Sequence, residues 1–149
     1  MLFRSSGVVL AWLGPLAGVE DALPNAADLA ITGTEAAGHL GVSVGVDDVD
    51  GDGQDDLLVG PNSIGEGVDP AGFLLVYYGP LAGGSLTAAD ADLVIAGVEP
   101  EGWFGYGEPR AGDVDGDGVP DLVIAAPLAD LQGPGSDSGA LYVLRGQGW

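Results

Sequence analysis

The chain has 149 residues, 46% of them apolar, which is enough for one ordinary domain with a hydrophobic core. It has 23 acidic residues but only three arginines and no lysine, so the net charge is −20. This charge argues against nucleic acid and anionic membranes as partners, and no apolar run is long enough to insert into a membrane. The chain has no cysteine and therefore no disulfides.

The first predicted strands are Val8–Leu13 and Leu29–Thr32. The N-terminal stretch, with an arginine before an apolar run and small residues after it, also resembles a short signal peptide. However, residues 7–18 are identical to residues 72–83 at seven of twelve positions. A cleaved leader has no reason to copy an internal segment, so we interpret Val8–Leu13 as a strand.

The next strand follows Leu40-Gly41 and leads into an acidic loop, residues 48–56, before an apolar strand at Leu57–Gly60. Aspartates occupy loop positions 1, 3, 5 and 9, and glycines at positions 4 and 6 allow a positive φ. Carboxylates at this density require a hard cation, and calcium tolerates an irregular cage better than magnesium does. We predict a Ca²⁺ site formed by the carboxylates of Asp48, Asp50, Asp52 and Asp56 and the main-chain carbonyl of Gln54.

Strands are predicted next at Phe73–Tyr78 and Leu93–Ala96, and the loop pattern then recurs 65 residues after its first copy, at residues 113–121. Neither loop is an EF-hand, because position 12 is Val59 or Ile124 where an EF-hand has a bidentate glutamate. We predict a second Ca²⁺ site formed by the carboxylates of Asp113, Asp115, Asp117 and Asp121 and the main-chain carbonyl of Val119.

The last predicted strands are Leu122–Ala125 and Ala140–Leu144. Units of four short strands that recur every 65 residues or so are typical of all-β proteins of the β-propeller class. We assign residues 1–33 to the last two strands of one blade, 34–97 to a complete blade, and 98–149 to three strands of a further blade. Residues 1–149 would then form a partial propeller of about two and a half blades.

The motifs around the second loop indicate a family. Phe104-Gly105 precedes the loop and Ala125-Ala126-Pro127 follows it, and together with the Asp-x-Asp-Gly-Asp-Gly-x-x-Asp pattern they resemble the FG-GAP repeats of integrin α-subunit β-propellers. The first repeat has Leu40-Gly41 and Gly60-Pro61 instead. The resemblance implies calcium bound by the loop aspartates on one face of a ring of about seven blades. We therefore expect a fragment of a longer propeller, with self-assembly of several copies as the alternative.

The resemblance also implies a secreted, extracellular or cell-surface module for adhesion or ligand recognition, with structural calcium and a protein or carbohydrate ligand. Recognition would use the connections 61–72, 83–92 and 127–138, because rigid scaffolds present binding residues on loops. One alternative is a non-catalytic propeller portion of a secreted hydrolase or lyase, and another is a structural spacer of a bacterial surface array. With one histidine, no cysteine and no lysine, we predict no catalytic residue here.

Overall fold

The computed structural model describes residues 7–14, 27–33, 39–61, 71–131 and 137–146, which form ten strands in three sheets and a single turn of 3₁₀ helix. The all-β fold class predicted from the sequence is therefore confirmed. The elements are β1 (Val8–Ala11), β2 (Leu29–Thr32), β3 (Leu40–Asp47), β4 (Asp56–Pro61), β5 (Phe73–Tyr77), β6 (Gly84–Thr87), η1 (Ala88–Asp90), β7 (Leu93–Ala96), β8 (Arg110–Gly112), β9 (Asp121–Ala126) and β10 (Ala140–Leu144).

The central sheet has four strands in the order β3-β4-β5-β7, and all its neighbours pair antiparallel. This is the meander of a propeller blade. The register places Val59 of β4 opposite Leu75 of β5, and Leu75 opposite Val94 of β7. The β-branched and leucine-rich runs at Leu57–Gly60 and Phe73–Tyr78 thus form the two inner strands of this sheet.

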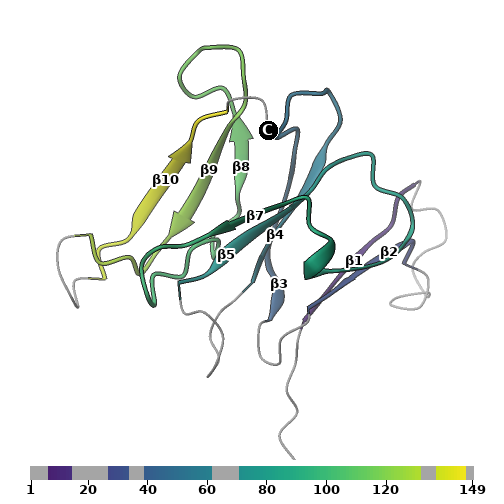
Figure 1. Cartoon of the computed structure of the whole chain (residues 1–149), viewed down its shortest axis with the longest axis horizontal. Helices are drawn as coiled ribbons and strands as arrows, with labels where there is room; N and C mark the ends of the chain where they lie inside the picture. The colour runs from purple at the N-terminus through teal and green to yellow at the C-terminus, as the bar shows by residue number, and fades with distance from the viewer. Residues whose placement is uncertain (1–6, 15–26, 34–38, 62–70, 132–136, 147–149) are drawn as a thin grey trace, which may run out of the picture.

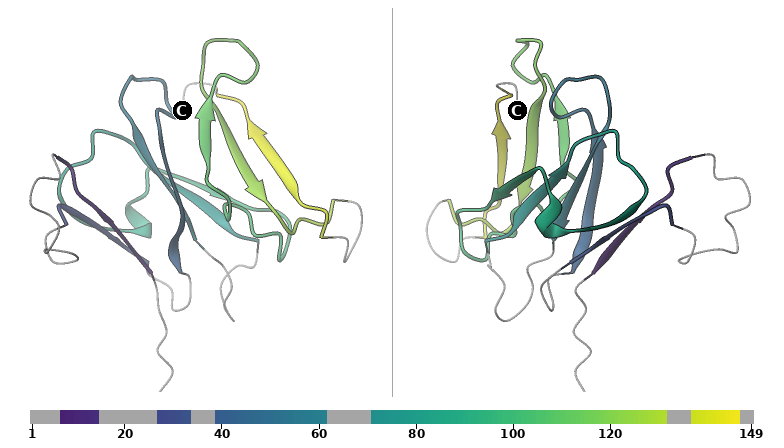
Figure 2. Two further views of the ribbon diagram at one scale, coloured as in Figure 1. Left: turned by 180° about the vertical axis from the view of Figure 1, so that it is seen from behind. Right: turned by 45° about the vertical axis from the view of Figure 1, so that its right-hand side comes forward.

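The inner strands β4 and β5 are buried on both faces, which explains why they are almost continuously apolar rather than alternating. Leu58 and Val76 face the β8–β10 sheet and join one hydrophobic cluster, whereas Val59 and Tyr77 face the opposite way and join a second cluster with β2. Figures 1 and 2 show the central sheet between the other two. The three sheets therefore stack face to face in chain order, as neighbouring blades do.

One outer sheet contains a strand that the sequence analysis missed. β1 and β2 pair antiparallel as expected, but β6 adds to the free edge of β2 in parallel, with Ile31 opposite Leu86. We had interpreted residues 83–92 as a connecting loop, and that interpretation is wrong for Gly84–Thr87. β6 follows β5 in the chain but leaves the central sheet to pair with the much earlier β2, and the amide of Gly84 donates to the carbonyl of Asp28 (2.7 Å) where the pairing begins. Local sequence carries no signal of such a long-range pairing.

The other outer sheet has the order β10-β9-β8, and its first strand, β8, is shorter than the equivalent β3 of the central sheet. β3 begins at Leu40, but β8 begins only at Arg110. Pro109 has no N–H to donate to a strand ladder, which accounts for the late start. Phe104 is buried instead, forms an isolated bridge with Gly72, and stacks edge-on against Tyr142 at 5.4 Å between ring centroids.

Polar contacts tie the central sheet to the β8–β10 sheet. The buried hydroxyl of Ser43 donates to the carbonyl of Gly105, and the amide of Ala111 donates to a carboxylate oxygen of Asp47 (3.0 Å). These contacts hold β3 and β8 side by side, so the loops that follow these two strands emerge at the same edge of the molecule (Figure 1).

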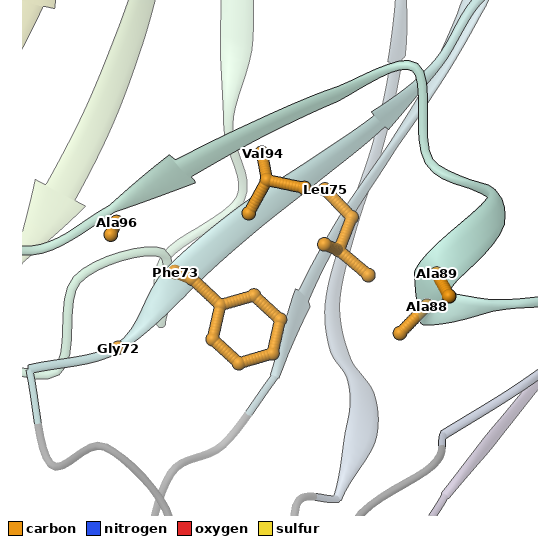
Figure 3. Close-up of a pocket in the computed structure, with 7 residues that line it drawn as sticks. All are labelled: Gly72, Phe73, Leu75, Ala88, Ala89, Val94 and Ala96. Atoms are coloured by element: carbon orange, nitrogen blue, oxygen red, sulfur yellow. The ribbon is translucent and has the colours of Figure 1, made fainter.

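The central sheet also borders a pocket. An apolar pocket of about 360 Å³ lies where β5 and β7 meet η1, and Phe73, Leu75 and Val94 line it with the alanines of η1 (Figure 3). None of its lining side chains is titratable, so this pocket offers apolar contact rather than reaction chemistry.

Within the part of the chain that the structure describes, no helix has the length and apolar character needed to cross a membrane.

Candidate metal centres

The two acidic loops occupy equivalent positions in two sheets. The first loop, residues 48–56, connects β3 to β4, and the second loop, residues 113–121, connects β8 to β9. Both lie at the same edge of the stacked sheets (Figures 1 and 2). The pairing of β3 with β4 extends to Asp47 and Asp56, and that of β8 with β9 extends to Gly112 and Asp121. The two ends of each loop are therefore fixed by paired strands.

Position 1 of each loop organises the turn through its carboxylate. One oxygen of Asp48 accepts from the amide of Gly51 (2.8 Å) and the other from the amide of Gly53 (2.9 Å). The carboxylate of Asp113 accepts from Gly116 (2.6 Å) and Gly118 (3.0 Å) in the same way. The loop backbone thus wraps around this one side chain.

The glycines at positions 4 and 6 make this wrapping feasible. Their φ values are +79° and +88° in the first loop and +83° and +88° in the second. An L-residue is strained at such angles, whereas glycine is not. The near-identity of the two pairs indicates that both loops have the same backbone path.

Position 9 anchors each loop to the body of the sheet. Asp56 and Asp121 are each only 1% exposed, and each accepts backbone hydrogen bonds with both oxygens. One bond comes from within the loop, at Val49 (2.8 Å) or Val114 (2.9 Å). The other comes from a glycine just beyond the third strand of the blade, Gly79 (2.8 Å) or Gly146 (3.0 Å). These donors stabilise the ionised carboxylate, and the bond from Gly146 is the largest cause that lowers the pKa of Asp121.

In each loop the carboxylates of three aspartates converge. Asp48, Asp50 and Asp56 form the first cluster, and Asp113, Asp115 and Asp117 form the second; within each, one oxygen per residue lies within 4.8 Å of the others. Oxygen ligands about 2.3–2.6 Å from a Ca²⁺ ion are at most about 5 Å apart, so the spacing suits a calcium-sized ion. The acidic clusters could therefore hold a metal ion.

The remaining predicted ligands are outside the clusters. The carboxylate of Asp52 accepts from the amide (2.8 Å) and the side-chain Nε2 (3.0 Å) of Gln54. Asp121 is held on the buried side of the second loop by the bonds described above. Ligation by Asp52, by Asp121 and by the carbonyls of Gln54 and Val119 stays a prediction.

Three neighbours of the loops were not foreseen as parts of the site. The amides of Gly79 and Gly146 donate to the position 9 aspartates, as described above. The Gly-Pro turn at residues 79–80, or a comparison of the two glycines between repeats, could have indicated them. Arg145 reaches Asp115, with 3.4 Å between Nη1 and Oδ2. Arg110 contacts the carboxylates of Glu108 (2.7 Å) and Asp47 (3.7 Å), of which Asp47 adjoins the first loop.

Comparison with known proteins places these loops in a family context. Residues 109–144, which contain the second loop, match the FG-GAP repeat. The chain is similar to integrin alpha-PS2 of Drosophila melanogaster, with 33% identity over 124 residues, or 78% of this chain and 8% of that protein. It is similar to integrin alpha-IIb of Homo sapiens, with 34% identity over 122 residues, or 78% of this chain and 11% of that protein.

A third relative is named as an enzyme. Phosphatidylinositol-glycan-specific phospholipase D of Homo sapiens is 34% identical over 101 residues, which is 66% of this chain and 12% of that protein. The chain thus spans about a tenth of the length of the curated relatives that it matches. The resemblance indicated by the loop pattern and its flanking motifs is confirmed: residues 109–144 match the FG-GAP repeat, and 78% of the chain is similar to integrin α-subunits.

Proposed function

We propose that this chain is a calcium-binding β-propeller module of the FG-GAP type, in which calcium is structural. The observation that carries the proposal is the pair of carboxylate clusters, which form in two loops with the same aspartate pattern and lie at one edge of the stacked sheets. Three anionic groups within 4.8 Å of one another repel each other strongly unless a cation neutralises them. Both loops are already wrapped around their first aspartate, so binding requires little reordering of the backbone.

The proposed ligands extend the two clusters by one carboxylate and one carbonyl each. In the first loop Asp52 and Gln54 would join Asp48, Asp50 and Asp56; in the second, Asp121 and Val119 would join Asp113, Asp115 and Asp117. Five protein ligands leave room for a water or two in the shell of a calcium ion, which takes six to eight oxygens. Such a filled shell suits stabilisation of the loop better than activation of a bound water.

The biological role we propose is adhesion or ligand recognition at the cell surface or in the extracellular space. The similarity to integrin α-subunits supports this role over 78% of the chain. A protein or carbohydrate ligand would be recognised on the connections between strands, of which residues 61–72 and 127–138 remain candidates, together with the part of 83–92 beyond β6. The net charge of −20 argues for a partner that is not nucleic acid.

We also propose that further blades cover the outer sheets. The assigned blade boundaries, 1–33, 34–97 and 98–149, leave the outward face of each end sheet bare: on β10, Leu141 is 67% exposed and Val143 is 45% exposed, and on β1, Val8 is 51% exposed. A propeller needs four or more blades to close. The missing blades would come from the same polypeptide in a ring of about seven, or from copies of this chain.

The alternative function is the non-catalytic propeller portion of a secreted hydrolase. The similarity to a phospholipase D over 66% of the chain favours it specifically. The calcium sites would be the same under both functions, and the difference would lie in the domain joined to the propeller. Hydrolysis of a glycosylated phosphatidylinositol by the longer protein would support this alternative, and cell attachment without such hydrolysis would support adhesion.

Calcium stoichiometry tests the ligand assignment. The whole chain should bind two Ca²⁺ ions by isothermal calorimetry, and Asp50→Ala or Asp115→Ala should each remove one, because each deletes a member of one cluster. The matched control is Asp55→Ala, which removes an exposed carboxylate of the first loop that lies outside the cluster. It should leave two ions bound and lower the affinity only modestly. Two ions bound by both cluster variants would contradict the assignment.

A further inference from the structure

The two loops share a backbone but differ in their electrostatic surroundings. The first loop has two additional carboxylates, Asp47 and Asp55, where the second has Gly112 and Pro120; Arg110 offsets the charge of Asp47 (3.7 Å), and Asp55 adds a full negative charge. The first cluster also includes the buried Asp56, whereas all three members of the second cluster are exposed. Negative charge and shielding from water both strengthen the attraction for a cation, so these differences favour the first loop.

The largest difference is a cation at the second loop. The guanidinium of Arg145 lies 3.4 Å from Asp115, which is a member of the second cluster. Arg145 directly follows β10 and precedes Gly146, whose amide donates to Asp121. The equivalent residue at the first loop is Tyr78, which directly follows β5 and precedes Gly79, whose amide donates to Asp56. A neutral phenol and a permanent positive charge thus occupy matching positions.

We propose that Arg145 makes the second loop the weaker of the two calcium sites, so that the first loop fills before it. This inference rests on the proposed calcium-binding function and adds an order of filling to it. Without calcium, Arg145 neutralises part of the second cluster. A bound Ca²⁺ takes over that neutralisation, so the ion pair with Asp115 is lost and the two cations repel each other.

The size of the effect follows from the exposure of the pair. The side chain of Arg145 is 73% exposed and that of Asp115 is 27% exposed, so water screens their attraction, and Arg145 can turn away into solvent. We therefore expect Arg145 to weaken calcium binding by about three- to tenfold rather than to block it. Because exposed charges are screened by salt, the difference between the loops should shrink as sodium chloride is raised.

The experiment reads each loop separately in the full chain. In an Asp50→Ala background, the single remaining calcium Kd by calorimetry belongs to the second loop, and Arg145→Gln or Arg145→Tyr should lower it about three- to tenfold. The reciprocal change, Tyr78→Arg in an Asp115→Ala background, should raise the Kd of the first loop by a similar factor. Circular dichroism at each calcium concentration reports whether each variant is folded.

The matched control is Arg110→Gln, which removes the same charge from a residue that contacts Glu108 and Asp47 instead of the second cluster. It should change the Kd of the second loop by less than about twofold, as expected for a charge acting at long range. An unchanged Kd in both Arg145 variants, or a shift equal to that of Arg110→Gln, would overturn the role of Arg145 alone. No calcium binding by the unsubstituted chain would overturn the proposed sites themselves, and this inference with them.

Discussion

At the scale of single residues, aspartate carboxylates take the place of backbone carbonyls as hydrogen-bond acceptors for several backbone amides. Asp48 and Asp113 hold the loop turns, Asp56 and Asp121 hold the loops against the sheet, and Asp92 accepts from the amide of Tyr78 (2.9 Å) where β5 ends. Their positions 1 and 9 in the loops could be predicted from the sequence, because the pattern is repeated. The distant donors Gly79 and Gly146 were not predicted, since nothing local connects them to the loops and only their repeated position after the third strand marks them.

Tyr77 is the residue whose titration makes the clearest prediction. It is 1% exposed, and its hydroxyl donates to the carbonyl of Thr87 (3.0 Å). Burial, with help from the charges of Asp90 and Asp92, raises the pKa of Tyr77 to about 12. The folded protein therefore holds this proton more tightly than the unfolded chain, whose tyrosines have a pKa of about 10. The stabilisation from Tyr77 is complete below pH 10 and should be lost as the pH rises to about 12.

This loss should be visible because the chain has no lysine or cysteine, which leaves only the other tyrosines to titrate in the same range. We expect the free energy of unfolding, from urea titrations between pH 9 and 12, to fall by about 2 kcal/mol. Tyr77→Phe should cost about 1 kcal/mol at pH 8 through its lost hydrogen bond, yet flatten the alkaline decline. Tyr106→Phe, at a residue 39% exposed, serves as the control and should leave the decline in place. An equally steep decline in Tyr77→Phe would contradict the assignment.

At the scale of elements, the strands that pair within a blade could be predicted from the sequence, and those that depend on a neighbouring blade could not. Leu29–Thr32, Leu93–Ala96 and Ala140–Leu144 match the predicted bounds, because each is a short apolar run limited by polar residues or glycine. β6 was missed because its partner, β2, lies far earlier in the chain, and β8 is short because Pro109 delays it.

The exposed face of β10 yields a prediction about association. Leu141 and Val143 point away from the core cluster on the side where a further blade would pack, and exposed apolar faces of this kind promote contact between chains. Leu141→Asp should reduce self-association, measured by light scattering in calcium buffer, while the melting temperature stays within about 2 °C, because exposed substitutions rarely change stability much.

The control for this prediction is Val98→Asp, which introduces the same charge at a residue 77% exposed that lies outside the strands. It should leave association unchanged. Equal association of the Leu141→Asp chain and the unsubstituted chain would argue that this face is not where a blade or a second copy docks.

At the scale of the whole molecule, two interfaces between sheets hold the structure together, and the acidic loops lie at one edge of it. The carboxylates add to a net charge of −20, whose self-repulsion opposes the compact state. Two calcium ions would cancel about four of these charges and would do so where the density is highest. Calcium should therefore act on the fold as a whole and not only on the loops.

A thermal melt with and without calcium tests this central claim most directly. A ligand that binds only the folded state adds about 1.4–2.7 kcal/mol per site at ten to a hundred times its Kd. For two sites in a chain of this size, removal of calcium by a chelator should lower the melting temperature by about 5–15 °C or abolish a cooperative transition. Magnesium should restore little of the loss, because it requires tight octahedral geometry. A melt that is the same in excess calcium and in excess chelator would contradict the structural role of calcium in this chain.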